Sequence, residues 1–317
     1  MINAEIKLER PKGEFTVKKW RNGEVSFDSG LQKNIVVNNY YRFITTVNST
    51  LNNPEYGGGD VNLMQLCAVS TDSTLVQYED TTLSNIISTR GMERSSLTVT
   101  EVDIEDKTYY KVTARYLWPM GAFVNQTIAK VSINRGNNPA NNLVAGQLIR
   151  DGLGNPVTIT ILEDEQLDIN YTLYIPKLVN VPVARSGVAV MGGVEYPYEV
   201  EYRLARMWVP TSVGLQYGRV HYASWQINDT TINTGSMIPT VYDNRIEYTA
   251  AHSIGVGSVY SPINSISLFT PTYAPFDNNA HTTGAYVVYR FTGNKPIKLD
   301  ADALSISAKL TISWDNS

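Results

Sequence analysis

The chain has 317 residues, a net charge of −4 and 18% charged residues, whereas Tyr alone occurs 20 times. A chain of this length can bury two cores of ordinary size. The sequence contains no cluster of Lys and Arg that would indicate nucleic-acid binding. It also contains no apolar run of about 18 residues that would indicate membrane insertion. The first residues also lack a signal-peptide pattern, so we expect a protein that is not exported.

The N-terminal region predicts an arm followed by a hairpin. Residues 1–12 are polar and predict an arm or an edge strand rather than core. Phe15 and Val17 then alternate toward Trp20, and Asn22-Gly23 predicts a tight turn because both residues tolerate positive φ. Apolar residues at i, i+3, i+4 and i+7 over residues 38–47 predict a short helix that covers a sheet.

The next region predicts short strands. Residues 64–69 read as a buried strand that contains the single cysteine, Cys67, which has no partner for an intramolecular disulfide. The spacing of Leu83, Ile86 and Ile87 predicts one helical turn. Strands are predicted over residues 96–103 and 109–118, joined by an acidic turn at residues 105–107.

Residues 143–176 predict three consecutive strands with turn signals between them. Residues 157–162 alternate apolar and polar side chains, and residues 167–175 do the same over a longer run. The segment 152–156, Gly-Leu-Gly-Asn-Pro, is typical of a tight reversal between them.

A similar segment recurs near the C-terminus. The apolar positions of residues 304–312 match those of residues 167–175 at an offset of 137, and a Gly-Asn-Lys-Pro turn at 293–296 precedes the second run. Upstream, Ile128, Val131 and Ile133 match residues 263–268 at an offset of 135. We interpret this as an internal duplication of about 70 residues with varied loops. The alternative is that any two amphipathic strands look alike.

The remaining segments give the domain prediction. Residues 177–193 contain Pro182 and several glycines with weak periodicity, which predicts a linker. Strands follow over residues 196–208, 217–225 and 241–248, separated by polar loops at 228–236 and 271–283. The predicted fold class is all-β: two β-sandwich domains, 1–180 and 181–317, with a short helix in the N-terminal half, related by a partial internal duplication.

The residue types that carry chemistry do not form a recognisable constellation. His221, His252 and His281 lack a further His or Cys at a zinc-ligand spacing. The densest acidic cluster, formed by Glu163, Asp164, Glu165 and Asp168, admits a calcium site or a carboxylate pair, but a solvated turn is favoured. No catalytic, cofactor-binding or metal-binding residue is therefore predicted, and the protein is not expected to be an enzyme. The aromatic residues are assigned to packing or subunit contact, with a glycan platform as the alternative.

Four segments, residues 31–38, 67–71, 83–90 and 145–175, resemble a group of tailed-bacteriophage virion proteins described as tail, tail-fibre or collar components. The clearest motifs are Gly-Asn-Pro-x-Thr-Ile-Thr at 154–160 and Leu-Asp-Ile-x-Tyr-x-Leu at 167–173. The resemblance covers about residues 31–176, and the second half departs from it except at 293–314. It implies a non-enzymatic β-sandwich protein, made in the bacterial host cytoplasm and located in the virion in several symmetric copies.

We therefore expect a tail-, neck/collar- or baseplate-associated structural protein that assembles as a homo-oligomer. The expected partners are other virion proteins and copies of the chain itself, with neither nucleic acid nor a membrane. The N-terminal half is assigned to virion attachment and the C-terminal half to assembly or host contact. Two alternatives remain: a receptor-binding module that uses loops 228–236 and 271–283 on host surface glycan, and a capsid decoration protein.

Overall fold

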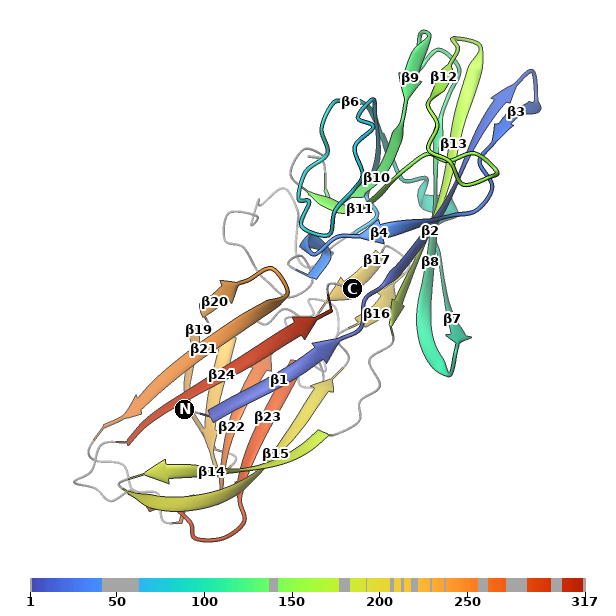
Figure 1. Cartoon of the computed structure of the whole chain (residues 1–317). Coiled ribbons are helices and arrows are strands. Elements are labelled where there is room, and N and C mark those ends of the chain that lie inside the picture. Colours follow the sequence, from blue (N-terminus) through green and yellow to red (C-terminus); the bar gives the residue numbers. More distant parts are fainter. Residues whose placement is uncertain are drawn as a thin grey trace.

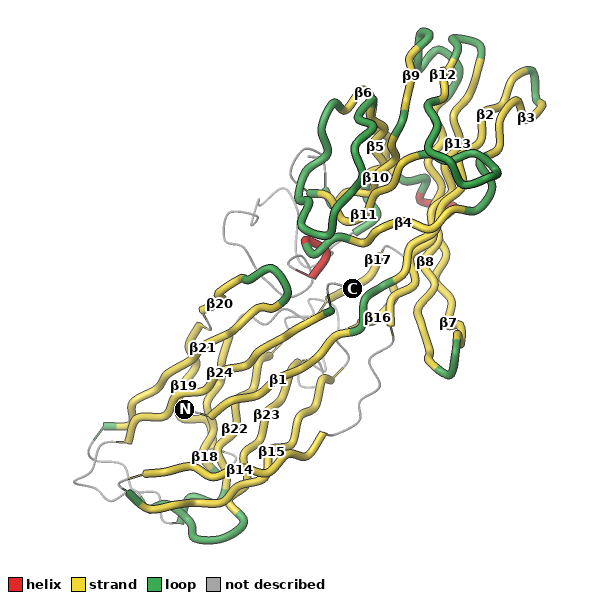
Figure 2. The backbone as a smooth tube through the Cα atoms, viewed as in Figure 1, coloured by secondary structure: helices red, strands yellow, loops and turns green. Residues whose placement is uncertain are grey.

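The chain folds into two elongated lobes of β-strands that lie end to end (Figure 1). A computed structural model describes residues 2–41, 63–136, 142–176, 183–191, 193–205, 208–211, 214–217, 222–228, 230–236, 238–255, 262–271, 284–297 and 304–315. We call the described residues within 12–176 the N-terminal lobe, and residues 2–8 together with the described residues within 183–315 the C-terminal lobe. The predicted all-β fold class is confirmed, since strands make up most of the described chain (Figure 2).

One ten-stranded sheet dominates the N-terminal lobe. Its strands, in spatial order, are β6 (Ile86–Gly91), β5 (Leu66–Ser70), β10 (Lys130–Asn134), β11 (Leu143–Leu148), β4 (Gln32–Val36), β2 (Lys12–Arg21), β13 (Glu165–Pro176), β8 (Lys107–Trp118) and β7 (Thr98–Ile104), with β3 (Glu24–Asp28) paired to β2. A separate two-stranded ribbon is formed by β9 (Gln126–Ile128) and β12 (Ile159–Ile161). A single turn of 3-10 helix, Arg94–Ser96, precedes β7.

Local sequence signals account for the central strands of this sheet. Along β13, Leu167, Ile169 and the later odd-numbered residues are buried while the even-numbered residues from Asn170 onward are only partly buried, as the alternation predicts. The β2–β3 hairpin turns at Asn22 and Gly23, whose φ angles are 54° and 82°. Two consecutive positive φ angles are typical of the type I′ turn, which matches the twist of a hairpin.

The sheet curls until strands from its two ends meet. The indole Nε1–H of Trp118 on β8 donates a hydrogen bond of 2.9 Å to Ser88 Oγ on β6, although the two strands lie near opposite ends of the sheet order. The hydroxyl of Tyr116, also on β8, donates a bond of 2.6 Å to the carbonyl of Met64. One sheet thus supplies both walls of the N-terminal core.

The C-terminal lobe is a sandwich of two sheets. The four-stranded sheet has the order β1 (Ile2–Leu8), β24 (Leu304–Trp314), β21 (Arg245–Ile254) and β20 (Ile238–Val241). The six-stranded sheet has the order β14 (Val183–Met191), β15 (Val194–Ala205), β23 (Gly284–Phe291), β22 (Ser265–Pro271), β18 (Tyr222–Ile227) and β19 (Thr230–Ser236). A separate hairpin joins β16 (Trp208–Thr211) to β17 (Gly214–Tyr217).

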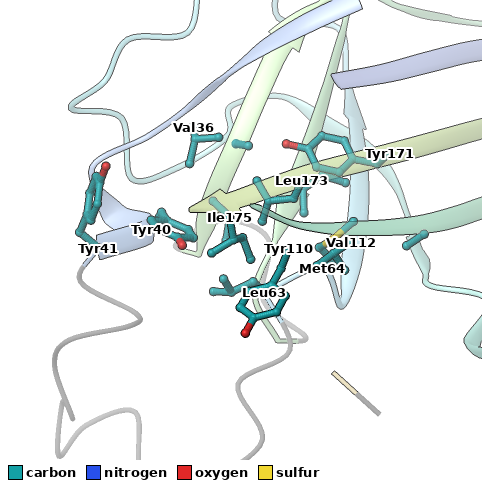
Figure 3. Close-up of a cluster of buried hydrophobic side chains, with 14 of the residues drawn as sticks. Val36, Tyr40, Tyr41, Leu63, Met64, Tyr110, Val112, Tyr171, Leu173 and Ile175 are labelled. Atoms are coloured by element: carbon teal, nitrogen blue, oxygen red, sulfur yellow. The ribbon is translucent and has the colours of Figure 1, made fainter. Parts of the chain in front are cut away.

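The hydrophobic core runs through both lobes without interruption. Ile254 of the four-stranded sheet and Ile266 and Tyr289 of the six-stranded sheet belong to the same buried cluster as the side chains of β13. Figure 3 shows part of this cluster in the N-terminal lobe, where Ile175 lies beside Tyr40 and Leu173 lies beside Tyr171. Each fully buried Leu or Ile side chain stabilises the fold by about 1.5–3 kcal/mol relative to an exposed one.

The N-terminal residues occupy an edge position in the far lobe. β1 pairs in parallel with β24, with Ile2 opposite Ala308 and Leu8 opposite Trp314. The edge-strand alternative for residues 1–12 is therefore confirmed for Ile2–Leu8. The boundary between the two predicted domains at residue 180 stays a prediction. The four-stranded sheet of the C-terminal lobe nevertheless includes β1, which comes from the N-terminal end of the sequence.

The two helix predictions have different outcomes. Residues 38–41 of the predicted helix at 38–47 are described, and residues 39–41 are helical; residues 42–47 lie outside the described ranges. The helical turn predicted from Leu83, Ile86 and Ile87 is wrong, because β6 begins at Ile86 and pairs with β5. Three apolar residues at helical spacing do not exclude a strand, and pairing with a buried neighbour decides between the two.

Two loop predictions are also wrong where the structure describes them. Val183–Met191, within the predicted linker, forms β14, and Thr230–Ser236, within a predicted loop, forms β19. Both strands lie at the edges of the six-stranded sheet, where one unpaired side tolerates the Gly-rich and polar residues that suggested loops. Most of the other predicted loop, residues 272–283, lies outside the described ranges.

The internal duplication stays a prediction. Each proposed copy contains an antiparallel pair, β10–β11 or β22–β23, followed by a long alternating strand, β13 or β24. The surroundings of the long strands differ, because β13 has antiparallel neighbours on both sides whereas β24 pairs in parallel with β1.

Candidate functional site

The acidic cluster singled out from the sequence lies where β12 turns into β13. Along β13, Glu165 shares a face with Leu167, whereas Asp168 projects from the opposite face because strand side chains alternate. These carboxylates therefore do not converge on one point, as a metal site or a catalytic pair would require.

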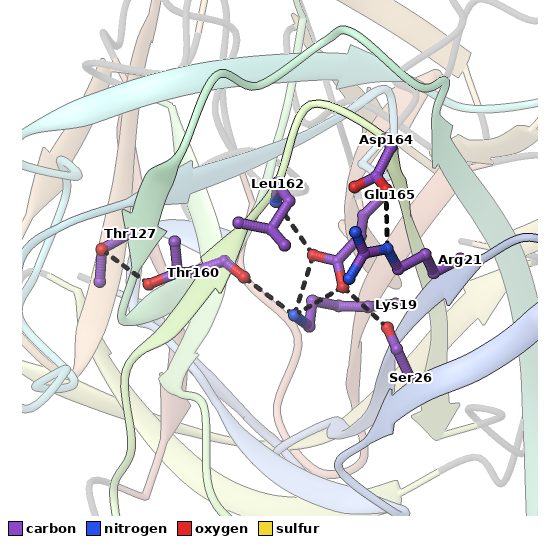
Figure 4. Close-up of polar contacts among 8 residues, drawn as sticks. All are labelled: Lys19, Arg21, Ser26, Thr127, Thr160, Leu162, Asp164 and Glu165. Carbon is purple, nitrogen blue, oxygen red and sulfur yellow. Dashed lines mark hydrogen bonds and ion pairs between the residues drawn. The ribbon is translucent and has the colours of Figure 1, made fainter.

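Glu165 is the centre of a buried polar network (Figure 4). Lys19 Nζ lies 3.0 Å and 2.9 Å from its two carboxylate oxygens, and the Ser26 hydroxyl and the Leu162 N–H each donate a further bond of 2.9 Å. Burial raises the pKa of Glu165, but the bonds from Leu162, Lys19 and Ser26 together bring that pKa below its ordinary value of 4.5. The ionised carboxylate thus fastens the β12–β13 turn to the β2–β3 hairpin.

A second ion pair lies beside this network on the surface. Arg21 Nε lies 2.7 Å from Asp164 Oδ2, and both side chains are about half exposed. Exposed pairs of this kind contribute little to stability. The pair nonetheless ties the same two turns together, and Figure 4 shows it next to Glu165.

Asp168 is committed to a bidentate pair on the other face of β13. Arg115 Nε and Nη2 lie 2.9 Å and 2.8 Å from its two carboxylate oxygens, so the planar guanidinium matches the carboxylate. Because Arg115 is on β8, the pair bridges two adjacent strands. The prediction of a solvated turn is therefore wrong for Glu165 and Asp168, which are both 3% exposed.

A buried lysine forms a similar contact elsewhere in the N-terminal lobe. Lys130 on β10 is 3% exposed, and its Nζ lies 2.7 Å from Asp72 Oδ2 and 3.2 Å from Thr74 Oγ1. This contact holds the loop after β5 against the sheet. The buried charged groups of the described part of the lobe thus stabilise a turn at Glu165, a loop at Lys130 and the pairing of two strands at Asp168.

A third polar and aromatic cluster, which we call the joint, connects the two lobes. It consists of Arg10, Asn38, Tyr41, Trp314 and Asp315. Trp314 stacks on Tyr41, and its Nε1–H donates a bond of 3.1 Å to Asn38 Oδ1. Arg10 Nη2 donates a hydrogen bond of 3.0 Å to Asn38 Oδ1, and Arg10 Nε donates one of 3.0 Å to the Asp315 carbonyl.

The joint also fixes the connection between β1 and β2. The Arg10 guanidinium lies 4.0 Å from the centre of the Tyr78 ring and donates a bond of 2.8 Å to the Val36 carbonyl. The Tyr109 hydroxyl donates a bond of 2.7 Å to Glu9 Oε1, and Lys107 pairs with the same carboxylate at 3.0 Å. The short connection between β1 and β2 is therefore bound to residues of both lobes.

The remaining candidates from the sequence lie apart from one another. Cys67 is a buried free thiol on β5, as predicted, and burial raises its pKa well above the ordinary value. His252 lies on β21 of the other lobe, while His221 and His281 lie outside the described ranges. Across the described ranges, no group of three or more His, Cys, Asp or Glu side chains is placed to hold a metal ion.

The aromatic residues of the described core serve packing, as predicted. The fully buried rings include Tyr40, Tyr41, Tyr109, Tyr116, Tyr171 and Tyr289. The hydrogen bonds described for their hydroxyl groups go to backbone or side-chain groups of the same chain. The Tyr116 hydroxyl, for example, donates to the Met64 carbonyl.

The exposed apolar side chains include two pairs, one on each lobe. At the end of the N-terminal lobe, Met120 and Val124 are about 60% exposed in the loop between β8 and β9, which is bound to the next turn through Gly121 N–H and the Glu163 carbonyl. On β14, Val188 and Val190 are more than half exposed on the edge strand of the six-stranded sheet. Exposed edge strands are templates for pairing with another chain.

Comparison of the chain with family models, with curated proteins and with solved structures finds no match. Among the residues that the structure describes, no helix has the length and apolar character needed to cross a membrane.

Proposed function

We propose that the chain is a structural component of a bacteriophage virion, associated with the tail, neck/collar or baseplate, that assembles as a symmetric homo-oligomer with copies of itself and other virion proteins. The phage assignment comes from the resemblance of residues 31–176 to virion proteins. The described structure adds physical support for a role in contact rather than in chemistry.

The observation that carries the proposal is the use of the buried carboxylates. Glu165 accepts bonds from Lys19, Ser26 and Leu162, and Asp168 accepts two from Arg115. Glu165 braces a turn and Asp168 braces two neighbouring strands, and carboxylates paired in this way offer no free acid or base to a substrate. A braced, strand-built body suits a protein that holds a fixed shape within a particle.

The joint supports the same proposal. Stacking of Trp314 on Tyr41 and the bonds of Arg10 connect the lobes through side chains from both. These bonds and the hydrophobic core that continues through both lobes oppose motion of one lobe relative to the other. The apolar positions Met120 and Val188 lie on different lobes and provide separate contact surfaces.

Two measurements test the proposal. Antibody raised against the purified chain is applied to phage particles from a strain that encodes it, and the labelled position is located by negative-stain microscopy. The mass of the purified protein is measured by light scattering after size exclusion. We expect label at the tail, collar or baseplate and a ring or trimer in solution.

Different results assign the chain elsewhere. A strictly monomeric protein that is absent from purified particles contradicts the proposal. Label on the capsid surface favours the decoration alternative. Binding of host cells by the purified chain, together with loss of this binding after replacement of residues 271–283, favours the receptor-binding alternative.

A further inference from the structure

We propose that β14 is a docking site for an extended basic segment of another protein, which adds to the six-stranded sheet as a further strand. The inference goes beyond the proposed function, because the edge of the sheet itself defines the chemistry of its occupant. Under the proposed function, that occupant belongs to another virion protein. Addition of a strand to a sheet edge gives affinity through main-chain hydrogen bonds and specificity through side chains.

The unpaired side of β14 is long and regular. All nine of its residues pair with β15, from Val183 opposite Tyr202 to Met191 opposite Val194, without a register shift. In the described strand order, β14 borders the six-stranded sheet and has β15 as its one neighbour (Figure 1). A strand that is paired on one side presents a row of N–H and C=O groups on the other side. That row is a template for a further strand.

The strands at the other ends of the three larger sheets carry features that oppose such pairing. β7 and β1 contain charged residues such as Glu101 and Lys7, and β20 contains Pro239. The pairing of β6 and of β19 is interrupted by register shifts. Charges, Pro and bulges protect edge strands. β14 has one charged residue, Arg185, near its start, and residues 186–190 contain neither a charge nor Pro, so its central part lacks this protection.

Packing against the core holds β14 in a fixed position. Ala189 lies opposite Tyr196, and both side chains pack against the hydrophobic core. Gly187 lies opposite Tyr198, whose ring approaches so closely that a Cβ at Gly187 would lie 2.6 Å from it. Because the template is already ordered, the loss of conformational freedom on binding is confined to the incoming segment.

The outer face beside this edge combines apolar and acidic side chains. Val188 and Val190 on β14 are 54% and 65% exposed. The exposed residues Glu195 and Glu199 on β15 lie opposite Val190 and Ser186, and residues opposite each other on adjacent strands share a face. An incoming strand therefore meets valines first and carboxylates one strand further away.

A lysine or arginine in the incoming strand fits this surface. Adjacent strands are about 4.8 Å apart, so the incoming strand lies about 10 Å from β15. A long basic side chain covers Val188 and Val190 with its methylene groups and reaches toward a β15 carboxylate with its charged end. Glu199 also lies opposite Arg290 of β23, whereas Glu195 lies beyond the end of the β15–β23 pairing. Glu195 is therefore the carboxylate best placed to select a basic segment.

The same charges argue against two other occupants. An acidic segment brings its carboxylates to within about one Debye length, roughly 8 Å, of Glu195 and Glu199, where like charges still repel. A second copy of β14 does not supply the required chemistry, because residues 186–190 contain no basic side chain.

Synthetic peptides test the proposal. The probe is a fluorescein-labelled nine-residue peptide in which Val alternates with Thr and Lys, and its binding to the full chain is measured by fluorescence anisotropy. Two further peptides have Glu in place of Lys, or N-methyl groups that block hydrogen bonding on both edges. We expect the Lys peptide to bind, the Glu peptide to bind about fivefold more weakly, and the N-methylated peptide to lose binding.

Variants of the chain locate the site. Val188→Lys puts a charge on the exposed face of β14 and should weaken binding of the Lys peptide at least about fivefold. The matched control is Val25→Lys, since Val25 is 44% exposed on β3 of the other lobe, and it should leave binding unchanged. Glu195→Lys should weaken binding of the Lys peptide about two- to fivefold and strengthen binding of the Glu peptide by a similar factor.

Several results would overturn the proposal. It fails if the Lys peptide does not bind, if N-methylation has no effect, or if Val25→Lys weakens binding as much as Val188→Lys. Conversion of a dimer into a monomer by Val188→Lys, without peptide binding, assigns the edge to a second copy and also refutes it. Label on the tail without peptide binding refutes the docking site alone. Peptide binding by a chain that is absent from particles supports the docking site and contradicts the virion role.

Discussion

The indole of Trp314 stacks on the ring of Tyr41 with ring centroids 4.3 Å apart and ring planes 9° apart. Trp314 ends the last strand of the C-terminal lobe, and Tyr41 follows β4 of the N-terminal lobe. Asn38, which accepts the indole N–H, is 276 residues away from Trp314 in the sequence. A single side chain thus supplies both an apolar and a polar contact between the lobes.

We expect Trp314→Ala to lower the free energy of unfolding by about 3–5 kcal/mol, because truncation of a buried Trp leaves a cavity. Trp314→Phe keeps a ring on Tyr41 and loses only the N–H, so its cost is about 1 kcal/mol. Asn38 Oδ1 retains its bond from Arg10 in both variants. Urea unfolding followed by circular dichroism measures the differences.

The matched control is Leu153→Ala, since Leu153 is 88% exposed in a turn. Its free energy of unfolding should lie within about 0.5 kcal/mol of the wild type. If Trp314→Ala unfolds at the same urea concentration as this control, the joint does not couple the lobes.

The Glu165 network makes stability depend on pH in a defined direction. The pKa of Glu165 is below 4.5 in the folded chain, so folding favours the ionised form. Its contribution is present above about pH 4.5 and is lost as the pH falls through the lower folded value. Glu165→Gln should cost about 3–5 kcal/mol at pH 7, because Lys19 is left in a largely buried site without its carboxylate.

The same variant should also flatten the decline of stability below pH 4.5. Some slope remains, because the hydrogen bonds from Lys130 and Thr74 outweigh the effect of burial and lower the pKa of Asp72 as well. Thermal unfolding from pH 3 to pH 7 measures both effects. The double variant Lys19→Met with Glu165→Gln should recover part of the loss at pH 7, and an unchanged pH profile for Glu165→Gln would refute the assignment.

The pair of Arg115 and Asp168 predicts unequal effects of its two truncations. The Asp168 side chain is 5% exposed and that of Arg115 is 38% exposed. Arg115→Ala leaves a buried carboxylate without a cation and should cost about 3–5 kcal/mol. Asp168→Asn leaves a cation that water can reach and should cost about 1–2 kcal/mol.

Arg115→Lys is the conservative control for this pair. It keeps the charge but loses the bidentate geometry, so its cost should lie between the other two. Denaturant titrations of the three variants give the order directly. A larger loss for Asp168→Asn than for Arg115→Ala would show that burial does not set the energy of this pair.

The sequence predicts elements whose signals are local. The alternation over residues 167–175 predicts β13, and Asn22-Gly23 predicts the β2–β3 turn, because a strand period and a turn conformation each depend on neighbouring residues. The helical turn predicted from the spacing of Leu83, Ile86 and Ile87 is wrong because that prediction also used only neighbouring residues. Three residues are too few to exclude a strand, and the choice of strand depends on the pairing of β6 with β5, which the local pattern does not contain.

The partners of the acidic residues and of β1 could not be predicted, because they are distant in sequence. Lys19 is 146 residues from Glu165, and Arg21 is 143 residues from Asp164. Without those cations in view, a carboxylate cluster in a turn looks solvated. The parallel pairing of β1 with β24 likewise joins the two ends of the chain and has no local signal.

The β7–β8 turn offers a gain in stability. Glu105 and Asp106 have φ angles of 51° and 63°, which cost about 1–2 kcal/mol per residue for side chains other than Gly and are better tolerated by Asn. Replacement by Asn-Gly, as E105N/D106G, should raise the free energy of unfolding by about 1 kcal/mol while the turn keeps its type I′ shape. The lost contact of Glu105 with Lys12 is 3.9 Å long and exposed, so it offsets little of this gain.

Gly23→Ala in the β2–β3 turn is the converse control. Its φ is 82° and an added Cβ would meet nothing within 4 Å, so the expected loss of about 1 kcal/mol comes from backbone conformation alone. Urea midpoints should move in opposite directions for the two variants with unchanged slopes. A lower midpoint for E105N/D106G would show that Glu105 and Asp106 make contacts in the folded chain that outweigh the strain of their backbone.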